Sequence, residues 1–170
     1  MENVFVITDF GAVGDGKTDC TLAFADAVDQ LSRKGGTVFV PAGEYVISNG
    51  LDLPIGVALV GEADKNGKPL STLLIYGGKG SEEEKPAVVM SYQSALKNLN
   101  FYYPEQEFVS GAPIPYPYTV MQNGSEGILL ENVCFVNSYR AVNLSAGSNN
   151  SLQTVRNISG TPLLTGIPLD

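Results

Sequence analysis

The stretch that decides the fold is ITDFGAVGDGKTDCTLAFADAVDQLSRKGGTVFVPAGEYVIS, residues 7–48. Its middle part repeats apolar residues at the spacing of one helix face, which predicts an amphipathic helix over residues 19–33. Thr18 or Asp19 can accept the free N–H groups at the start of this helix, and the pair Gly35 and Gly36 ends it. The apolar positions of the helix are Cys20, Phe24, Ala27, Val28 and Leu31.

After the helix the chain consists of short apolar or alternating segments separated by Gly, Pro, Asn and Ser, a pattern typical of strands. Few of these segments are joined by the two-residue turns that hairpins prefer, so antiparallel hairpins do not dominate. The predicted strands are 37–40, 44–48, 57–61, 72–76, 87–90, 96–103, 127–137, 140–144 and 152–159.

A short pattern recurs in three of these strands, each time with Asn between a charged and an apolar residue. The asparagines are Asn98, Asn132 and Asn157, which are 34 and 25 residues apart. Unequal spacing with the same local pattern indicates a solenoid whose coils share a core while their loops differ in length. We expect these side chains to point inward and to stack in neighbouring coils of a parallel β-helix.

Residues 7–48 closely resemble the opening of the pectate lyase superfamily domain, in which DFGAxGDGxTDxTxAFxxAI leads into a capping helix and GGTVxxPAGxYxI forms the first coil. The resemblance implies an all-β solenoid, a right-handed single-stranded parallel β-helix with an N-terminal capping α-helix. We expect one structural unit, with an N-terminal strand, a Gly/Asp turn and the capping helix over 1–36. The β-helix coils follow over 37–170 and are expected to be truncated at the C-terminus.

The glycines of DFGAVGDG are interpreted as turn residues rather than as a phosphate-binding loop, because no βαβ units repeat through the chain. Asp15 and Asp19 are expected to accept backbone N–H groups near the start of the helix.

Composition excludes several classes of function. The net charge of −8 lacks the basic surface that nucleic acids and anionic membranes require, so neither is an expected partner. The chain has no histidine, which removes His-based triads and His-ligated metals. Cys20 and Cys134 lie far apart without metal-ligand spacing, and both are expected to pack as small hydrophobic residues.

The most promising segment for a site is FYYPEQEFVSGAPIPYPY, residues 101–118, which combines tyrosines, glutamates and prolines. A proline-stiffened loop that presents aromatic rings suits stacking against sugars, and its Glu105 and Glu107 are weak candidates for acid/base work. The acidic run Glu82, Glu83 and Glu84 is interpreted as a solvated loop. The candidate substrate-binding residues are Tyr102, Tyr103, Tyr116, Tyr118, Tyr139 and Arg140.

The resemblance implies a polysaccharide-active β-helix protein, similar to pectate lyases and glycoside hydrolases, and this chain is expected to be a fragment of a larger enzyme that is inactive in isolation. The Gly-His-Gly and Arg-x-Lys elements of polygalacturonase-like hydrolases are missing. A non-catalytic, glycan-binding module of the tailspike or adhesin type is the alternative. The expected partner is a polysaccharide or oligosaccharide, no cofactor is expected (calcium only for a lyase), and the full-length protein is expected to be extracellular or periplasmic.

Overall fold

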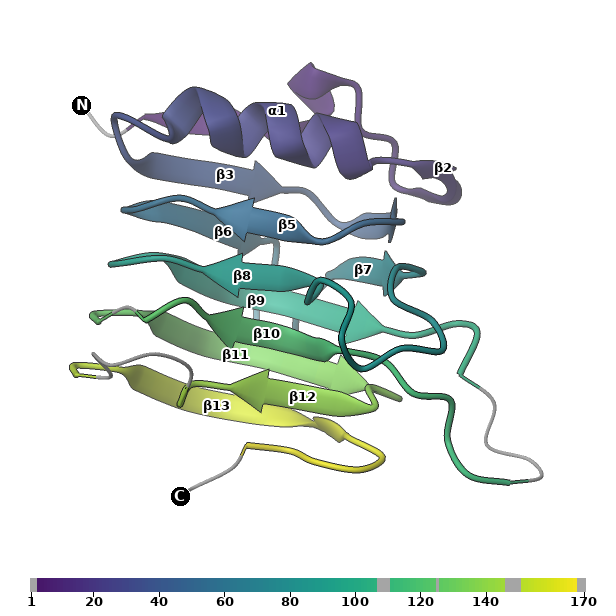
Figure 1. Cartoon of the computed structure of the whole chain (residues 1–170). Helices are drawn as coiled ribbons and strands as arrows, with labels where there is room; N and C mark the ends of the chain where they lie inside the picture. The colour runs from purple at the N-terminus through teal and green to yellow at the C-terminus, as the bar shows by residue number, and fades with distance from the viewer. Residues whose placement is uncertain (1–2, 107–110, 125, 146–150, 168–170) are drawn as a thin grey trace.

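The computed structural model describes residues 3–106, 111–124, 126–145 and 151–167. They form one α-helix, one short 3-10 helix and a series of parallel strands that wind into stacked coils (Figure 1). The helices are η1 (Ile7–Phe10) and α1 (Thr21–Leu31). The strands are β1 (Val4–Val6), β2 (Asp15–Asp19), β3 (Gly36–Val40), β4 (Gly43–Ile47), β5 (Leu51–Leu53), β6 (Val57–Gly61), β7 (Ser71–Ile75), β8 (Val88–Met90), β9 (Ala95–Tyr102), β10 (Tyr118–Gln122), β11 (Leu129–Val136), β12 (Arg140–Asn143) and β13 (Thr154–Thr161).

The coils produce two parallel sheets. One contains β5, β8, β10 and β12, and the other contains the remaining nine strands. The long strands β9, β11 and β13 bend in the middle, and for this reason β9 pairs with β6 through its first half and with β7 through its second. The predicted right-handed parallel β-helix is therefore confirmed. The N-terminal strand is present as β1, whereas the short strands β2, β5 and β10 were not predicted.

The core is built from residues that occupy the same place in successive coils. Val38, Leu59, Leu96 and Leu130 follow one another in register and are fully buried. Farther along β9 and β11, the rings of the register partners Phe101 and Phe135 stack with centroids 5.5 Å apart. Burial of each such side chain contributes about 1.5–3 kcal/mol, so every additional coil extends one continuous hydrophobic core.

Helix α1 covers the first coil, as predicted, although it is shorter than expected at both ends (Figure 1). Phe24, Val28 and Leu31 are buried beneath it, and the Phe24 ring meets Tyr45 edge-on at 5.8 Å. Asp19 lies at the end of β2 and accepts the N–H of Thr21 at 2.9 Å. An apolar cap of this kind shields strand ends that would otherwise be free to pair with other chains.

The asparagines that mark the bends form a ladder. Asn98, Asn132 and Asn157 adopt left-handed backbone conformations with φ between 53° and 55°, which Asn tolerates better than most residues. Asn132 donates to Asn98 at 2.8 Å, and Asn157 donates to Asn132 at 2.7 Å. The predicted stacking is confirmed.

The predicted inward direction of the asparagines was wrong. Asn98 and Asn132 are half-buried and Asn157 is exposed, whereas Leu130 and Val133 on either side of the bend fill the interior. Asn132 also donates to the carbonyl of Gly67 at 2.6 Å, in the loop between β6 and β7. The left-handed residue thus turns its side chain toward the outside of the bend.

Candidate functional site

Two long loops leave the coils at the same end of the four-stranded sheet (Figure 1). One joins β7 to β8 over residues 76–87, and the other joins β9 to β10 over residues 103–117, described at 103–106 and 111–117. The N–H of Gly80 donates to the carbonyl of Pro115 at 2.8 Å, and Lys79 forms an ion pair with Glu105 at 3.1 Å. The two loops therefore form one wall. We call this wall, with the outer side of β5, β8, β10 and β12, the loop face.

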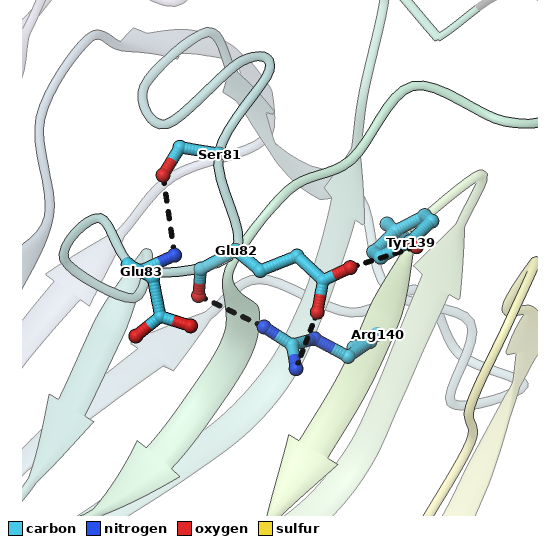
Figure 2. A network of polar contacts seen from close by, with 5 residues as sticks. All are labelled: Ser81, Glu82, Glu83, Tyr139 and Arg140. Carbon is cyan, nitrogen blue, oxygen red and sulfur yellow. Dashed lines mark hydrogen bonds and ion pairs between the residues drawn. The ribbon is translucent and has the colours of Figure 1, made fainter.

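The central polar cluster of the loop face joins the 76–87 loop to the start of β12. Glu82 Oε1 accepts a hydrogen bond from the Tyr139 hydroxyl at 2.9 Å, and its Oε2 forms an ion pair with Arg140 at 3.0 Å (Figure 2). A second guanidinium nitrogen of Arg140 donates to the Glu82 backbone carbonyl at 2.9 Å. The Glu82 carboxylate is thus bound through both of its oxygens by two consecutive residues, Tyr139 just before β12 and Arg140 at its start.

The guanidinium of Arg140 lies over the face of an aromatic ring. The guanidinium lies 4.4 Å from the centroid of Tyr118, which occupies the equivalent position on β10. Only 18% of the Arg140 side chain is exposed, and its Nε is buried without a hydrogen-bond partner among the described residues. A cation over an aromatic face is attracted by the ring quadrupole, so Tyr118 fixes the plane in which Arg140 presents its donors.

The acidity of the Tyr139 hydroxyl depends on its contact with Glu82. The hydrogen bond to the Glu82 carboxylate raises the pKa of the Tyr139 hydroxyl, because that bond and the nearby negative charge favour the protonated phenol. Tyr139 therefore acts here as a hydrogen-bond donor, and it lies beside the cationic donors of Arg140.

Two of the predicted binding tyrosines lie in the interior instead. Tyr103 and Tyr116 are buried, and their rings meet edge-on at 4.8 Å. The Tyr103 hydroxyl bonds to Thr119 at 2.7 Å. Burial raises the pKa of Tyr103, and it raises that of Tyr116 to about 12. The 103–117 loop folds these rings inward, so we do not retain them as ligand contacts.

The remaining predicted residues are divided between two places. Tyr118, Tyr139 and Arg140 come together on the loop face, whereas Tyr102 is half-buried on β9, in register with Leu74 and Val136 of the other sheet. Glu105 is part of the loop wall through its ion pair with Lys79. Glu107 lies outside the described residues.

Glu82 was not among the predicted site residues, because it belongs to an acidic run interpreted as a solvated loop. Glu82 reaches Arg140 across 58 residues of chain, and no local pattern reports such a contact. Lys85 of the same loop pairs with Asp52 on β5 at 2.8 Å. The described residues contain no group of three or more His, Cys, Asp or Glu that could hold a metal ion. Calcium requires clustered oxygen ligands, so we derive no step through a metal.

A second carboxylate is bound on the opposite, nine-stranded sheet. Glu131 on β11 forms ion pairs with Arg156 on β13 at 2.9 Å and with Lys97 on β9 at 3.6 Å. These three residues are direct register partners in adjacent coils. The Arg156 guanidinium beside Glu131 lowers the pKa of that carboxyl group.

Known proteins are similar to parts of this chain in sequence. A probable rhamnogalacturonase C of Aspergillus flavus is 43% identical over 126 residues, which cover 71% of this chain and 23% of that protein. Mannuronan C5-epimerase AlgE3 of Azotobacter vinelandii is 51% identical over 47 residues, covering 27% of this chain and 3% of the epimerase. The chain thus spans less than a quarter of each of these two relatives.

Solved structures support the fold alone. An iota-carrageenase complexed to iota-carrageenan fragments matches 98% of this chain and 39% of its own, with a TM-score of 0.64 and 17% identity. The Streptococcus pneumoniae surface protein and adhesin PfbA matches 97% of this chain and 56% of its own, with a TM-score of 0.54 and 17% identity. The described part of the chain contains no helix long and apolar enough to cross a membrane.

The model of one protein family, rhamnogalacturonase A/epimerase, pectate lyase-like, matches residues 4–108. This match spans more than half of the chain and includes the capping helix and the first coils. The chain therefore belongs to the rhamnogalacturonase A/epimerase, pectate lyase-like family.

Proposed function

We propose that this chain is part of a polysaccharide-acting protein and that its loop face binds the glycan. The observation that carries the proposal is the cluster of Tyr118, Tyr139 and Arg140 beside the loop wall. Aromatic rings and a guanidinium supply the apolar faces and polar donors that sugar rings require. The rhamnogalacturonase and epimerase among its relatives support the choice of a polysaccharide.

The geometry supports binding rather than cleavage by this chain alone. Hydrolysis of a glycosidic bond normally needs two carboxyl groups that face each other across the bond. On the loop face, the side chains of Asp52, Glu82 and Glu105 each form an ion pair with a lysine or an arginine. We therefore propose that the chain binds glycan without a cofactor, and that turnover requires groups beyond those described.

We also propose where the whole protein acts. Polysaccharides of this kind lie outside the cytoplasm, so we place the whole protein in an extracellular or periplasmic setting. A protein that binds glycans without cleaving them at all would use the same face, and the fold shared with the adhesin PfbA is compatible with that role. The experiment below separates the two.

The test screens the 170-residue chain against pectin, rhamnogalacturonan, alginate, carrageenan and a neutral glucan by affinity electrophoresis. Tyr118→Ala should weaken binding about tenfold, because it removes an aromatic contact and the support of Arg140. The matched control is Tyr92→Ala, since Tyr92 is an exposed tyrosine outside the loop face. Thermal melts verify that both variants are folded.

Absence of binding to all five glycans, or equal losses in the Tyr118→Ala and Tyr92→Ala variants, would overturn the proposal. The same samples are assayed for unsaturated products and for new reducing ends. Turnover that disappears in Glu105→Gln or Glu107→Gln would contradict the binding-only role and place catalysis in the 103–117 loop.

A further inference from the structure

We propose that Tyr139 and Arg140 form a receptor for the carboxylate of an acidic sugar, and that the side chain of Glu82 occupies this receptor as an internal ligand. This inference rests on the proposed function, because it assumes that glycans bind the loop face. It adds the chemical class of the ligand, a uronate, and a competitor built into the chain.

The bonding pattern around Glu82 is that of a bound carboxylate. Its Oε1 accepts from the Tyr139 hydroxyl at 2.9 Å, and its Oε2 meets a guanidinium nitrogen of Arg140 at 3.0 Å (Figure 2). A uronate carboxylate offers the same two oxygens in the same planar geometry. Arginine suits planar oxyanions better than lysine does, because its guanidinium presents several donors in one plane.

The receptor remains in place when Glu82 leaves. Tyr139 and Arg140 lie at the start of β12, which pairs with β10, and the backbone carbonyl of Tyr139 accepts the N–H of Leu164 at 2.9 Å. The Tyr118 ring packs against the Arg140 guanidinium, whose central carbon lies 4.4 Å from the ring centroid. The donors are thus preorganised by strands and by stacking, which reduces the entropic cost of binding a ligand.

Glu82, in contrast, is easily displaced. Its side chain is 39% exposed and comes from a loop, and partly exposed ion pairs of this kind are weak. The 76–87 loop has other anchors, namely the Gly80 bond to Pro115 and the ion pair of Lys85 with Asp52. Rotation of the Glu82 side chain therefore opens the receptor without releasing the loop.

Charge alone would also affect an acidic ligand, because Glu82 is followed by Glu83 and Glu84. Glu83 provides the matched control. Its carboxylate makes none of the contacts drawn in Figure 2, and its bond to Ser81 uses the backbone N–H, which a substitution retains. Glu83→Ala and Glu82→Ala remove the same charge from neighbouring positions, but only Glu82→Ala removes the carboxylate that Tyr139 and Arg140 bind, while the bond from Arg140 to the backbone carbonyl of residue 82 is retained.

The experiment measures binding of trigalacturonate, and of its fully methyl-esterified form, by isothermal titration calorimetry at one fixed ionic strength. We expect wild type to prefer the acid. Glu82→Ala should bind the acid about fivefold more tightly than Glu83→Ala does, the factor by which a weak internal competitor reduces affinity. Tyr139→Phe, which removes only the hydroxyl, should weaken binding of the acid and leave binding of the ester unchanged.

The outcomes separate this inference from the proposed function. Equal binding of acid and ester, or equal effects of Glu82→Ala and Glu83→Ala, overturns the receptor while leaving glycan binding intact. A wild-type and Glu82→Ala pair that binds neither trigalacturonate nor the glycans of the earlier panel overturns both. A sulfated galactan trisaccharide that binds more tightly than trigalacturonate would replace the uronate with a sulfate ester and contradict the class named here.

Discussion

Glu131 and Glu82 are two carboxylates that bind basic side chains on opposite sides of the coil stack, and they are held in different ways. Glu131 lies within β11, between a lysine of β9 and an arginine of β13 that are its register partners. Glu82 comes from a loop and reaches two residues at the start of β12. The sheet positions Glu131. Glu82 is positioned by a loop, and its side chain can leave its partners without moving a strand.

This difference indicates where function can be sought in a solenoid. A charge fixed by strand register is part of the stacking of the coils, because changing its partner would require moving a strand. A charge supplied by a loop can leave its partner without disturbing the core, and ligand-binding residues are found disproportionately on loops. We therefore expect the Glu131 side to govern stability and the Glu82 side to govern binding.

The largest expected effect is a loss of stability on the nine-stranded sheet, the side on which strand register positions Glu131. Asn132→Leu removes the side-chain hydrogen bonds with Asn98, Asn157 and Gly67, and it places a bulky residue at φ 55°. Unpaired polar groups cost about 1–3 kcal/mol, and the strained backbone adds about 1–3 kcal/mol. Urea denaturation should show that the free energy of unfolding falls by about 1–3 kcal/mol from each of these two causes.

Asn132→Gly separates the two causes, since glycine accepts this φ without strain and loses only the side-chain hydrogen bonds of Asn132. A smaller loss for Gly than for Leu is expected. Equal stability of Asn132→Leu and wild type would contradict a structural role for the ladder.

A smaller effect is expected from Glu131→Gln, and it should depend on pH. The folded-state pKa of Glu131 is lowered, so its contribution to stability is present above the unfolded pKa of about 4.3 and is lost as pH falls through the folded value. At neutral pH the substitution should cost at most about 1 kcal/mol, because the pair is partly exposed. Denaturation curves at pH 7 and pH 3 measure this, and a loss that grows in acid would count against it.

The corresponding change on the loop face should barely affect stability. Glu82→Ala is expected to alter the free energy of unfolding by less than about 0.5 kcal/mol, since the 76–87 loop keeps its other anchors. The same denaturation assay compares it with Glu131→Gln. A loss larger than that of Glu131→Gln would show that Glu82 is a structural residue and would remove the contrast.

The smallest effect concerns the ionisation of Tyr139. Because its pKa is raised by the hydrogen bond to Glu82 and by the charge of that carboxylate, Glu82→Ala should lower it toward the ordinary value of about 10. Ultraviolet titration of the phenolate in Glu82→Ala, with Glu83→Ala as the control, reports the shift. Identical titration curves would mean that Tyr139 does not bind Glu82 in solution.

The sequence predicts much of the architecture because its signals are local. The helix that begins near Thr21 follows from apolar spacing, and the bends follow from asparagine between charged and apolar neighbours. The direction of the asparagine side chains could not be predicted, because the left-handed conformation interrupts the alternation on which inward and outward assignments rest.

The loop face was less predictable, since its contacts join distant segments. Tyr139 and Arg140 were identified next to a core strand, but their partner Glu82 belongs to a run that reads as solvated. Tyr103 and Tyr116 lie in the same tyrosine- and proline-rich segment as Tyr118, and only the folded loop shows that their rings are buried against each other.

The central claim is tested most directly by a crystal structure of the chain with bound trigalacturonate. We predict one sugar carboxylate within hydrogen-bonding distance of the Tyr139 hydroxyl and the Arg140 guanidinium, with the Glu82 side chain rotated away and the coils unchanged. An oligosaccharide bound elsewhere, with Glu82 still paired to Arg140 and Tyr139, would contradict the account.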